Sequence, residues 1–165
     1  LRTPEVRADL YTKEKKVRSS FKGDYPTEVE RPGFVAALIE LLRAALKAAW
    51  INDPLQLVDK IELKIDSSFK GTENAVTNGN KITFNYHRLF DEIPLNFADI
   101  IRTLFHEAAH VIQHNMTEQE FEKVFGKMYY MNPDISLSLY VFQRKESHAV
   151  YMAAGIEPEK ITNGW

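Results

Sequence analysis

The stretch FADIIRTLFHEAAHVIQH, which follows Asn96 and runs to about His114, predicts an amphipathic helix. At about 100° per residue, its apolar residues fall on one broad arc, formed by Phe97, Ile100, Ile101, Leu104, Ala108, Val111 and Ile112. Pro94 precedes the stretch, and Asn96 followed by Asp99 is a variant of the capping box. We expect the apolar arc of this helix to build the core of the protein.

The polar side of the same helix carries the motif H-E-x-x-H, formed by His106, Glu107 and His110. The two histidines lie one helical turn apart and point the same way, off the face that builds the core. The motif is typical of zinc metallohydrolases, in which the histidines bind the metal and the glutamate acts as general base. The sequence therefore predicts a catalytic Zn²⁺ site, with Glu107 beside the metal and not bound to it.

A catalytic zinc also needs a third protein ligand, and the last part of the chain offers two. The helix predicted from about residue 134 to residue 155 contains Glu146 and His148. Glu146 lies in the middle of an apolar stripe, where an ionised carboxylate requires a partner. Zinc held by two neutral histidines is such a partner, and a salt bridge to Arg102 or Lys145 is the alternative. We expect Glu146 to be the third ligand, with His148 as the other candidate.

Length and composition limit what this protein can be. With 165 residues, of which 44% are hydrophobic and 27% charged, the chain fits one globular domain. Its net charge of −2 gives no indication of a nucleic-acid partner, and no uncharged apolar run is long enough for a membrane span. There is no cysteine, which excludes disulfides and thiolate zinc ligands.

The remaining segments predict an α+β fold. Residues 1–32 are charge-rich and are expected to form an N-terminal arm or linker, followed by a single domain over residues 33–165. An alanine- and leucine-rich scaffold helix is expected to begin that domain and to end near Asn52. Alternating residues and an Asn-Gly pair at 78–79 predict a small antiparallel sheet with a hairpin over about residues 61–87. Thr117 and Glu120 form a capping box, which predicts the start of a further helix.

The combination of H-E-x-x-H on one helix and Glu146 on another resembles the gluzincin group of zinc metallopeptidases. The sequences HEAAHVIQ (106–113) and ESHAVYMAA (146–154) look most like small bacterial metallopeptidase domains, which are carried as C-terminal toxin or effector modules by secreted proteins. The resemblance covers residues 81–155. It implies a mainly helical zincin-like domain with an active-site helix and a third-ligand helix. It also implies that the strand KITFNY (81–86) is the edge strand of a cleft in which a peptide or protein substrate lies extended.

By this resemblance, the protein is expected to be a zinc metallopeptidase in which Glu107 takes a proton from water and delivers it to the leaving amine. Four residues are open as stabilisers of the oxyanion, namely Tyr86, Tyr130, Tyr151 and His148. Two alternatives also stay open. One is hydrolysis of a non-peptide amide such as a cell-wall bond. The other is a zinc-stabilised binding module without catalysis, which would need a fourth ligand such as His114 or His148.

Partners and location follow from the same resemblance. The chain begins at Leu1 without an initiator methionine, so we expect a piece of a longer protein or a chain from which a leader has been removed. A toxin of this kind would be secreted or delivered into the periplasm of a target bacterium. A cognate inhibitor or immunity protein is then a further expected partner.

Overall fold

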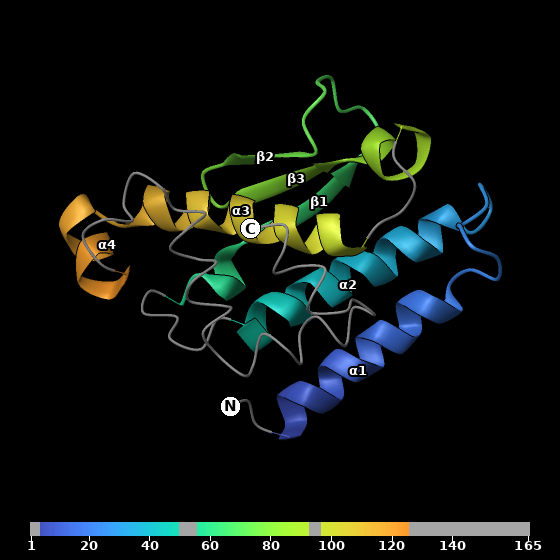
Figure 1. Cartoon of the computed structure of the whole chain (residues 1–165), viewed down its shortest axis with the longest axis horizontal. Coiled ribbons are helices and arrows are strands. Elements are labelled where there is room, and N and C mark those ends of the chain that lie inside the picture. Colours follow the sequence, from blue (N-terminus) through green and yellow to red (C-terminus); the bar gives the residue numbers. More distant parts are fainter. Residues whose placement is uncertain (1–3, 50–55, 93–96, 126–165) are drawn as a thin grey trace.

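The helix expected to run to about His114 is present as α3 (Phe97–Asn115). A computed structural model describes residues 4–49, 56–92 and 97–125 of the chain, and α3 runs through the middle of the described part (Figure 1). The inner face of α3 is buried, as the sequence predicts, and it comprises Ile100, Ile101, Leu104, Phe105, Ala108, Val111 and Ile112. The helix is therefore held by its apolar face, and its polar face is left for other contacts.

The scaffold helix is α2 (Arg31–Ala49), which confirms the prediction over its described residues. It packs against the first strand and against α3, and its leucines are almost completely buried. Near its start, the fully buried Phe34 ring meets Phe21 edge-on at 5.6 Å between centroids and Phe90 at 5.7 Å. Such edge-to-face pairs add to the stabilisation that burial of the rings provides.

The start of α2 is set by a reciprocal cap that precedes it. The backbone N–H of Thr27 donates to Glu30 Oε1 at 2.9 Å, and the N–H of Glu30 lies 3.3 Å from Thr27 Oγ1. Glu30 also accepts from the backbone N–H of Lys22 at 3.0 Å. These hydrogen bonds, first of all the one from the Thr27 backbone, lower the pKa of the Glu30 carboxyl below its usual value.

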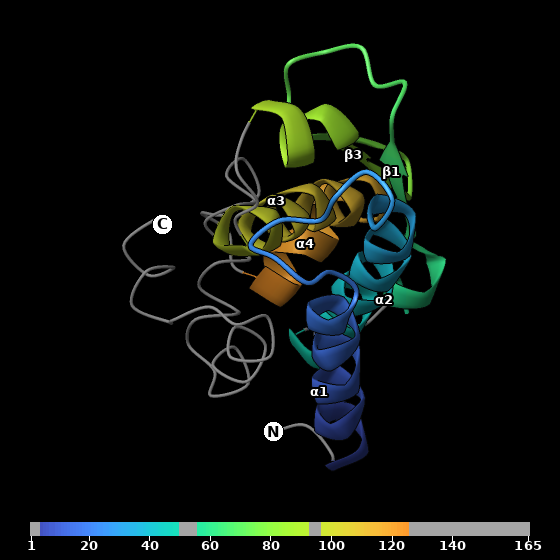
Figure 2. The same cartoon turned by 90° about the vertical axis from the view of Figure 1, so that its right-hand side faces the viewer.

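The first 32 residues, which were expected to form an N-terminal arm or linker, include a helix. They contain helix α1 (Pro4–Ser19), which packs along α2 (Figure 2). Leu10 and Val17, seven residues apart and so on the same side of the helix, are buried in the common core. These two residues attach α1 to the core.

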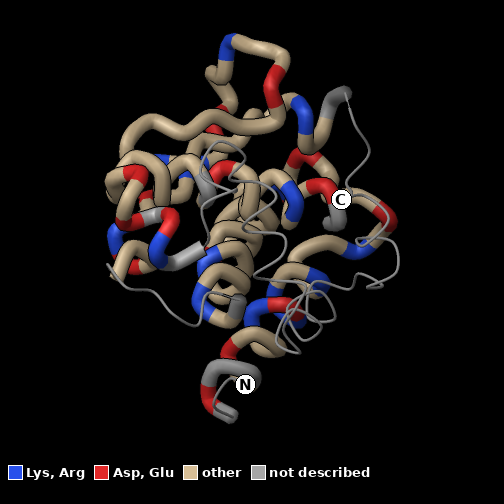
Figure 3. The backbone as a smooth tube through the Cα atoms, turned by 60° about the vertical axis from the view of Figure 1, so that its left-hand side comes forward, with Lys and Arg blue, Asp and Glu red and all other residues tan. Residues whose placement is uncertain are grey.

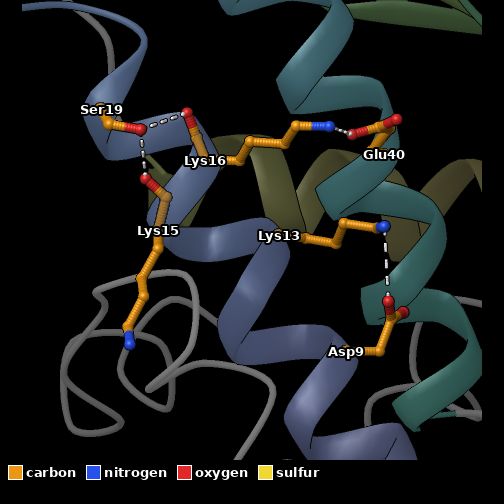
Figure 4. A network of polar contacts seen from close by, with 6 residues as sticks. All are labelled: Asp9, Lys13, Lys15, Lys16, Ser19 and Glu40. Atoms are coloured by element: carbon orange, nitrogen blue, oxygen red, sulfur yellow. Dashed lines mark hydrogen bonds and ion pairs between the residues drawn. The ribbon is translucent and has the colours of Figure 1, made fainter.

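The polar contacts around α1 are exposed. Lys16 Nζ lies 3.1 Å from Glu40 Oε2 of α2, and Lys13 lies 3.4 Å from Asp9 within α1 (Figure 4). Figure 3 shows basic and acidic residues mixed along the described chain. Exposed pairs of this kind contribute about 1 kcal/mol or less, so burial of Leu10 and Val17 is the main attachment of α1.

Replacing Leu10 by alanine is therefore expected to destabilise the whole described fold. Leu10 is 1% exposed, and truncating a buried leucine costs about 2–5 kcal/mol. Urea unfolding followed by circular dichroism measures the loss, with Tyr11→Ala as the control, because Tyr11 is 48% exposed on the same helix. An unchanged unfolding midpoint for Leu10→Ala would mean that α1 does not belong to the core.

The sheet has three strands, β1 (Glu62–Asp66), β2 (Ala75–Asn78) and β3 (Lys81–Asn85). The predicted hairpin is confirmed, since β2 and β3 pair antiparallel with Asn78 opposite Lys81. Gly79 opens the two-residue turn at φ +61°, in the position that takes glycine in type II′ hairpins. The residues of the turn itself are therefore sufficient to explain the expected hairpin.

The sheet as a whole is mixed, and the expectation of an antiparallel sheet is wrong. The strand order is β1-β3-β2, with β1 parallel to β3. The chain reverses direction twice between β1 and β3, and β3 inserts between its two predecessors. Alternation of residues predicts strands but not their spatial order, so the sequence pattern could not distinguish this arrangement.

The same strand order corrects the expected edge strand. The segment KITFN of β3 is central, whereas β2 lies at the edge and runs beside α3 (Figure 1). Ala75 and Thr77 of β2 pair with the buried Phe84 and Ile82 of β3, so all four face the helices. The strand that borders the polar face of α3 is therefore β2.

Shorter elements complete the described part. The turns η1 (Val58–Lys60) and η2 (Arg88–Glu92) flank the sheet, and α4 (Glu118–Phe125) follows α3. The capping box before α4 is confirmed by two 3.2 Å hydrogen bonds between Thr117 and Glu120. None of the described helices has the length and apolar character that crossing a membrane requires. The helix expected at residues 134–155 lies outside the described residues.

Candidate functional site

The two motif histidines lie together on the outer side of α3. The ring centroids of His106 and His110 are 5.0 Å apart, with an interplanar angle of 76°. His106 is half-buried and His110 is exposed. The two histidines are close because they are one helical turn apart. They lie on the outer side because the apolar arc of the helix faces the core.

The Nδ1 atom of His110 has a defined partner. It lies 3.1 Å from Oε1 of Gln113, one turn further along α3. An amide oxygen only accepts, so Nδ1 is the donor in this contact, and Nε2 is the ring nitrogen that this hydrogen bond does not use. Metal-binding histidines are typically oriented in this way by a hydrogen bond from the other ring nitrogen. The tautomer of His110 thus suits a ligand that binds through Nε2.

Glu107 points away from water and toward strand β2. It is 7% exposed, and its carboxylate Oε2 accepts a hydrogen bond from the hydroxyl of Thr77. The same hydroxyl lies 3.2 Å from the backbone carbonyl oxygen of Glu107. A buried carboxylate needs such a donor, because desolvation without a hydrogen bond costs several kcal/mol or more.

Two hollows border Glu107 between β2 and α3. One, of about 410 Å³, is lined by Ala75, Val76, Thr77, Gly79, Glu107, His110 and His114. The other, of about 370 Å³, is lined by Glu73, Asn74, Ala75, Arg102, Thr103, His106 and Glu107. Ala75 and Glu107 border both hollows, so the glutamate lies where they meet, with one motif histidine in each.

One hydrogen bond ties the hairpin turn to the end of α3, and two others hold the loop before β2 to the end of β3. At the turn, Asn115 Nδ2 at the end of α3 donates to Asn80 Oδ1 at 2.7 Å. At the other end, the buried Asn85 amide donates to the carbonyl oxygens of Gly71 and Glu73 at 3.2 and 3.0 Å. These contacts hold the loop and the strand that border both hollows.

Two of the expected zinc ligands, His106 and His110, lie within the described residues. His106 and His110 offer two imidazole nitrogens from successive turns, which is the ligand pair that zinc prefers in this motif. Within residues 4–49, 56–92 and 97–125, no group of three His, Cys, Asp or Glu side chains that could hold a metal is present. The predicted third ligand Glu146 and its alternative His148 lie outside the described residues.

The one described tyrosine among the candidates for oxyanion stabilisation, Tyr86, lies away from the hollows beside the motif. Tyr86 lines neither hollow; its ring lies 4.8 Å from that of Phe90, and its hydroxyl accepts from Arg31 Nη1 at 3.5 Å. Tyr130 and Tyr151 lie outside the described residues. His114, considered as a fourth ligand, is exposed in the larger hollow beside Gly79.

Comparison of the chain with protein-family models, with curated proteins and with solved structures found no match.

Sequence reasoning missed Thr77, the residue that contacts Glu107 directly. A signal was present, since alternation within AVTN places Thr77 on the same face as the apolar Ala75. That pattern indicates an inward-facing hydroxyl, which needs a partner. It could not identify Glu107 as that partner, because the two residues are 30 positions apart in the chain.

Proposed function

We propose that this protein is a zinc-dependent hydrolase that cleaves peptide bonds, with Glu107 as its general base. The observation that carries the proposal is the position of the Glu107 carboxylate. It is buried at the junction of two hollows, and each hollow is lined by one histidine of the motif. A carboxylate beside a pair of potential zinc ligands, and held by another residue, is suited to proton transfer.

The roles of the chain's own residues follow from this position. His106 and His110 would hold the metal together with Glu146, with His148 as the alternative third ligand. Zinc supplies Lewis acidity when bound, which lowers the pKa of water and polarises a carbonyl group. Glu107 then accepts the proton of the attacking water and returns it to the leaving amine.

Strand β2 is the surface along which we propose that the substrate lies. One edge of β2 is paired with β3. Its other edge borders the hollows beside α3. Strand addition to a sheet edge binds extended peptides through main-chain hydrogen bonds. This favours a peptide substrate over a compact non-peptide amide.

The two alternatives make different demands on the site. A zinc ion used for structure alone needs four closed ligands and has no use for a carboxylate held between two hollows. Hydrolysis of a cell-wall amide would use the same residues with another substrate. The role as a delivered toxin, with secretion and an inhibitor protein as its consequences, stays a prediction from the resemblance.

The test is metal-dependent cleavage of a protein substrate. We expect the full 165-residue chain, loaded with zinc, to release fluorescence from labelled casein. Incubation with 1,10-phenanthroline should abolish the release, and added zinc should restore it. Fragments of peptidoglycan are assayed in parallel. Cleavage of peptidoglycan without cleavage of casein would favour the amide alternative, and zinc binding without either activity would favour the binding module.

A further inference from the structure

The contact between Thr77 and Glu107 joins the edge strand to the motif helix. Thr77 Oγ1 donates to Oε2 of the carboxylate and lies 3.2 Å from the backbone carbonyl oxygen of the same glutamate. Thr77 is half-buried and Glu107 is buried. The hydroxyl therefore reaches both the side chain and the backbone of Glu107, so it defines where this carboxylate lies relative to the helix.

We propose that Thr77 is a positioning residue for Glu107, whose hydroxyl holds Oε2 and leaves Oε1 to exchange the proton of the reacting water. This inference rests on the proposed hydrolase function. A carboxylate has two oxygens and can rotate about its terminal bond, whereas a hydrogen bond to one oxygen removes that freedom. Thr77 acts through Glu107 and is not itself a catalytic residue.

The surroundings of Thr77 make it suitable for this role. Its backbone is paired with Ile82 of β3, and the hairpin turn is tied to the end of α3 by the hydrogen bond between Asn80 and Asn115. The strand therefore cannot slide along the helix without breaking these contacts. A threonine side chain is also stiff, because branching at Cβ restricts its rotamers.

Thr77 borders only one of the two hollows that meet at Glu107, and its hydroxyl donates to Oε2 of that carboxylate. Thr77 lines the hollow that contains His110 and His114, but not the hollow that contains His106. Glu107 lines both. The hydrogen bond is charge-assisted and partly shielded from water, which makes it stronger than a neutral contact at the surface.

The test compares Thr77→Val, which removes the hydroxyl and keeps the shape, with Thr77→Ser, which keeps the hydroxyl. The substrate is a quenched fluorescent peptide that spans a site cleaved in casein. We expect Thr77→Val to lower kcat roughly 10- to 100-fold, in line with the loss of a hydrogen bond to a charged group. KM should change little, because the residue acts on the base and not on the substrate. Thr77→Ser should recover most of the lost kcat.

The matched control is Thr83→Val. Thr83 lies on β3 and alternates with the buried Ile82 and Phe84, so it occupies the opposite face of the sheet from Thr77. The same chemical change at this position should leave kcat and KM unchanged. Zinc content is measured for every variant, so that a loss of metal is not taken for a loss of positioning.

A second measurement tests the contact in the metal-free protein, independently of activity. Urea unfolding midpoints are compared for Thr77→Val, Glu107→Ala and the double variant. We expect Thr77→Val to lower the midpoint clearly in the parent, where it leaves a buried carboxylate without its donor. It should lower the midpoint much less in the Glu107→Ala background.

Four results would overturn the inference. Equal destabilisation by Thr77→Val in both backgrounds would show that the two side chains are not coupled. Coupling with an unchanged kcat, or a rise in KM alone, would show that the contact is structural or that Thr77 binds substrate, while the hydrolase function would stand. An inactive parent protein would instead refute the hydrolase function, and the positioning role with it, even where the stability measurements show coupling.

Discussion

Replacing Glu107 by glutamine is expected to abolish nearly all hydrolysis while leaving zinc content close to that of the parent. Removal of a positioned acid–base group costs typically about 10²–10⁴-fold in rate. Glutamine retains the shape of the side chain and an oxygen that can accept from Thr77, so the buried contact with β2 is kept. What is lost is the ability of the side chain to take a proton.

The measurement is kcat with the quenched peptide, together with zinc content after gel filtration. Glu118→Gln is the control, because Glu118 is an exposed residue in the first turn of α4. If Glu107→Gln cleaves the peptide as fast as the parent does, the assignment of Glu107 as base is wrong, whatever the metal content.

Replacing His106 or His110 by alanine is expected to remove zinc and activity together. Each substitution takes away one nitrogen of a ligand pair that lies on a single helix face. The affinity for zinc should fall by more than roughly 10- to 100-fold, which is the typical cost of losing a residue that hydrogen-bonds to a metal ligand. His114→Ala is the matched control, since His114 is one turn further along α3 and is exposed. Its zinc content should be unchanged.

The same assay identifies the third ligand. Zinc content and competition with a chromogenic chelator are measured for Glu146→Ala and His148→Ala. We expect zinc loss in the glutamate variant and retention in the histidine variant. The reverse pattern would replace Glu146 by His148 as ligand, and full zinc retention in His106→Ala would remove the basis for a site on α3.

Several features of this protein could be predicted from short stretches of its sequence. The apolar arc of residues 97–115 predicted both the helix and its buried face, and the structure confirms both. The hairpin around Gly79 and the capping box at Thr117 were predictable for a similar reason. Each depends on residues within about one helical turn or one tight turn of each other, so the local physical chemistry is sufficient.

The motif itself also belongs to what the sequence determined. His106 and His110 are neighbours because they are four residues apart on a helix, and the apolar arc of that helix excludes them from the core. None of this requires knowledge of another element.

Only the tertiary structure decided what surrounds the motif. The parallel pairing of β1 with β3, the place of β2 at the edge and the docking of α1 through Leu10 and Val17 all join segments far apart in the chain. So does the hydrogen bond from Thr77 to Glu107. These contacts depend on which apolar faces are buried together in the whole fold. The alternation of residues or the charge content of one segment does not identify the segment against which it packs. The helix that carries the motif could therefore be predicted from its own residues. The strand that contacts Glu107 could not, because the packing of the whole fold places it there.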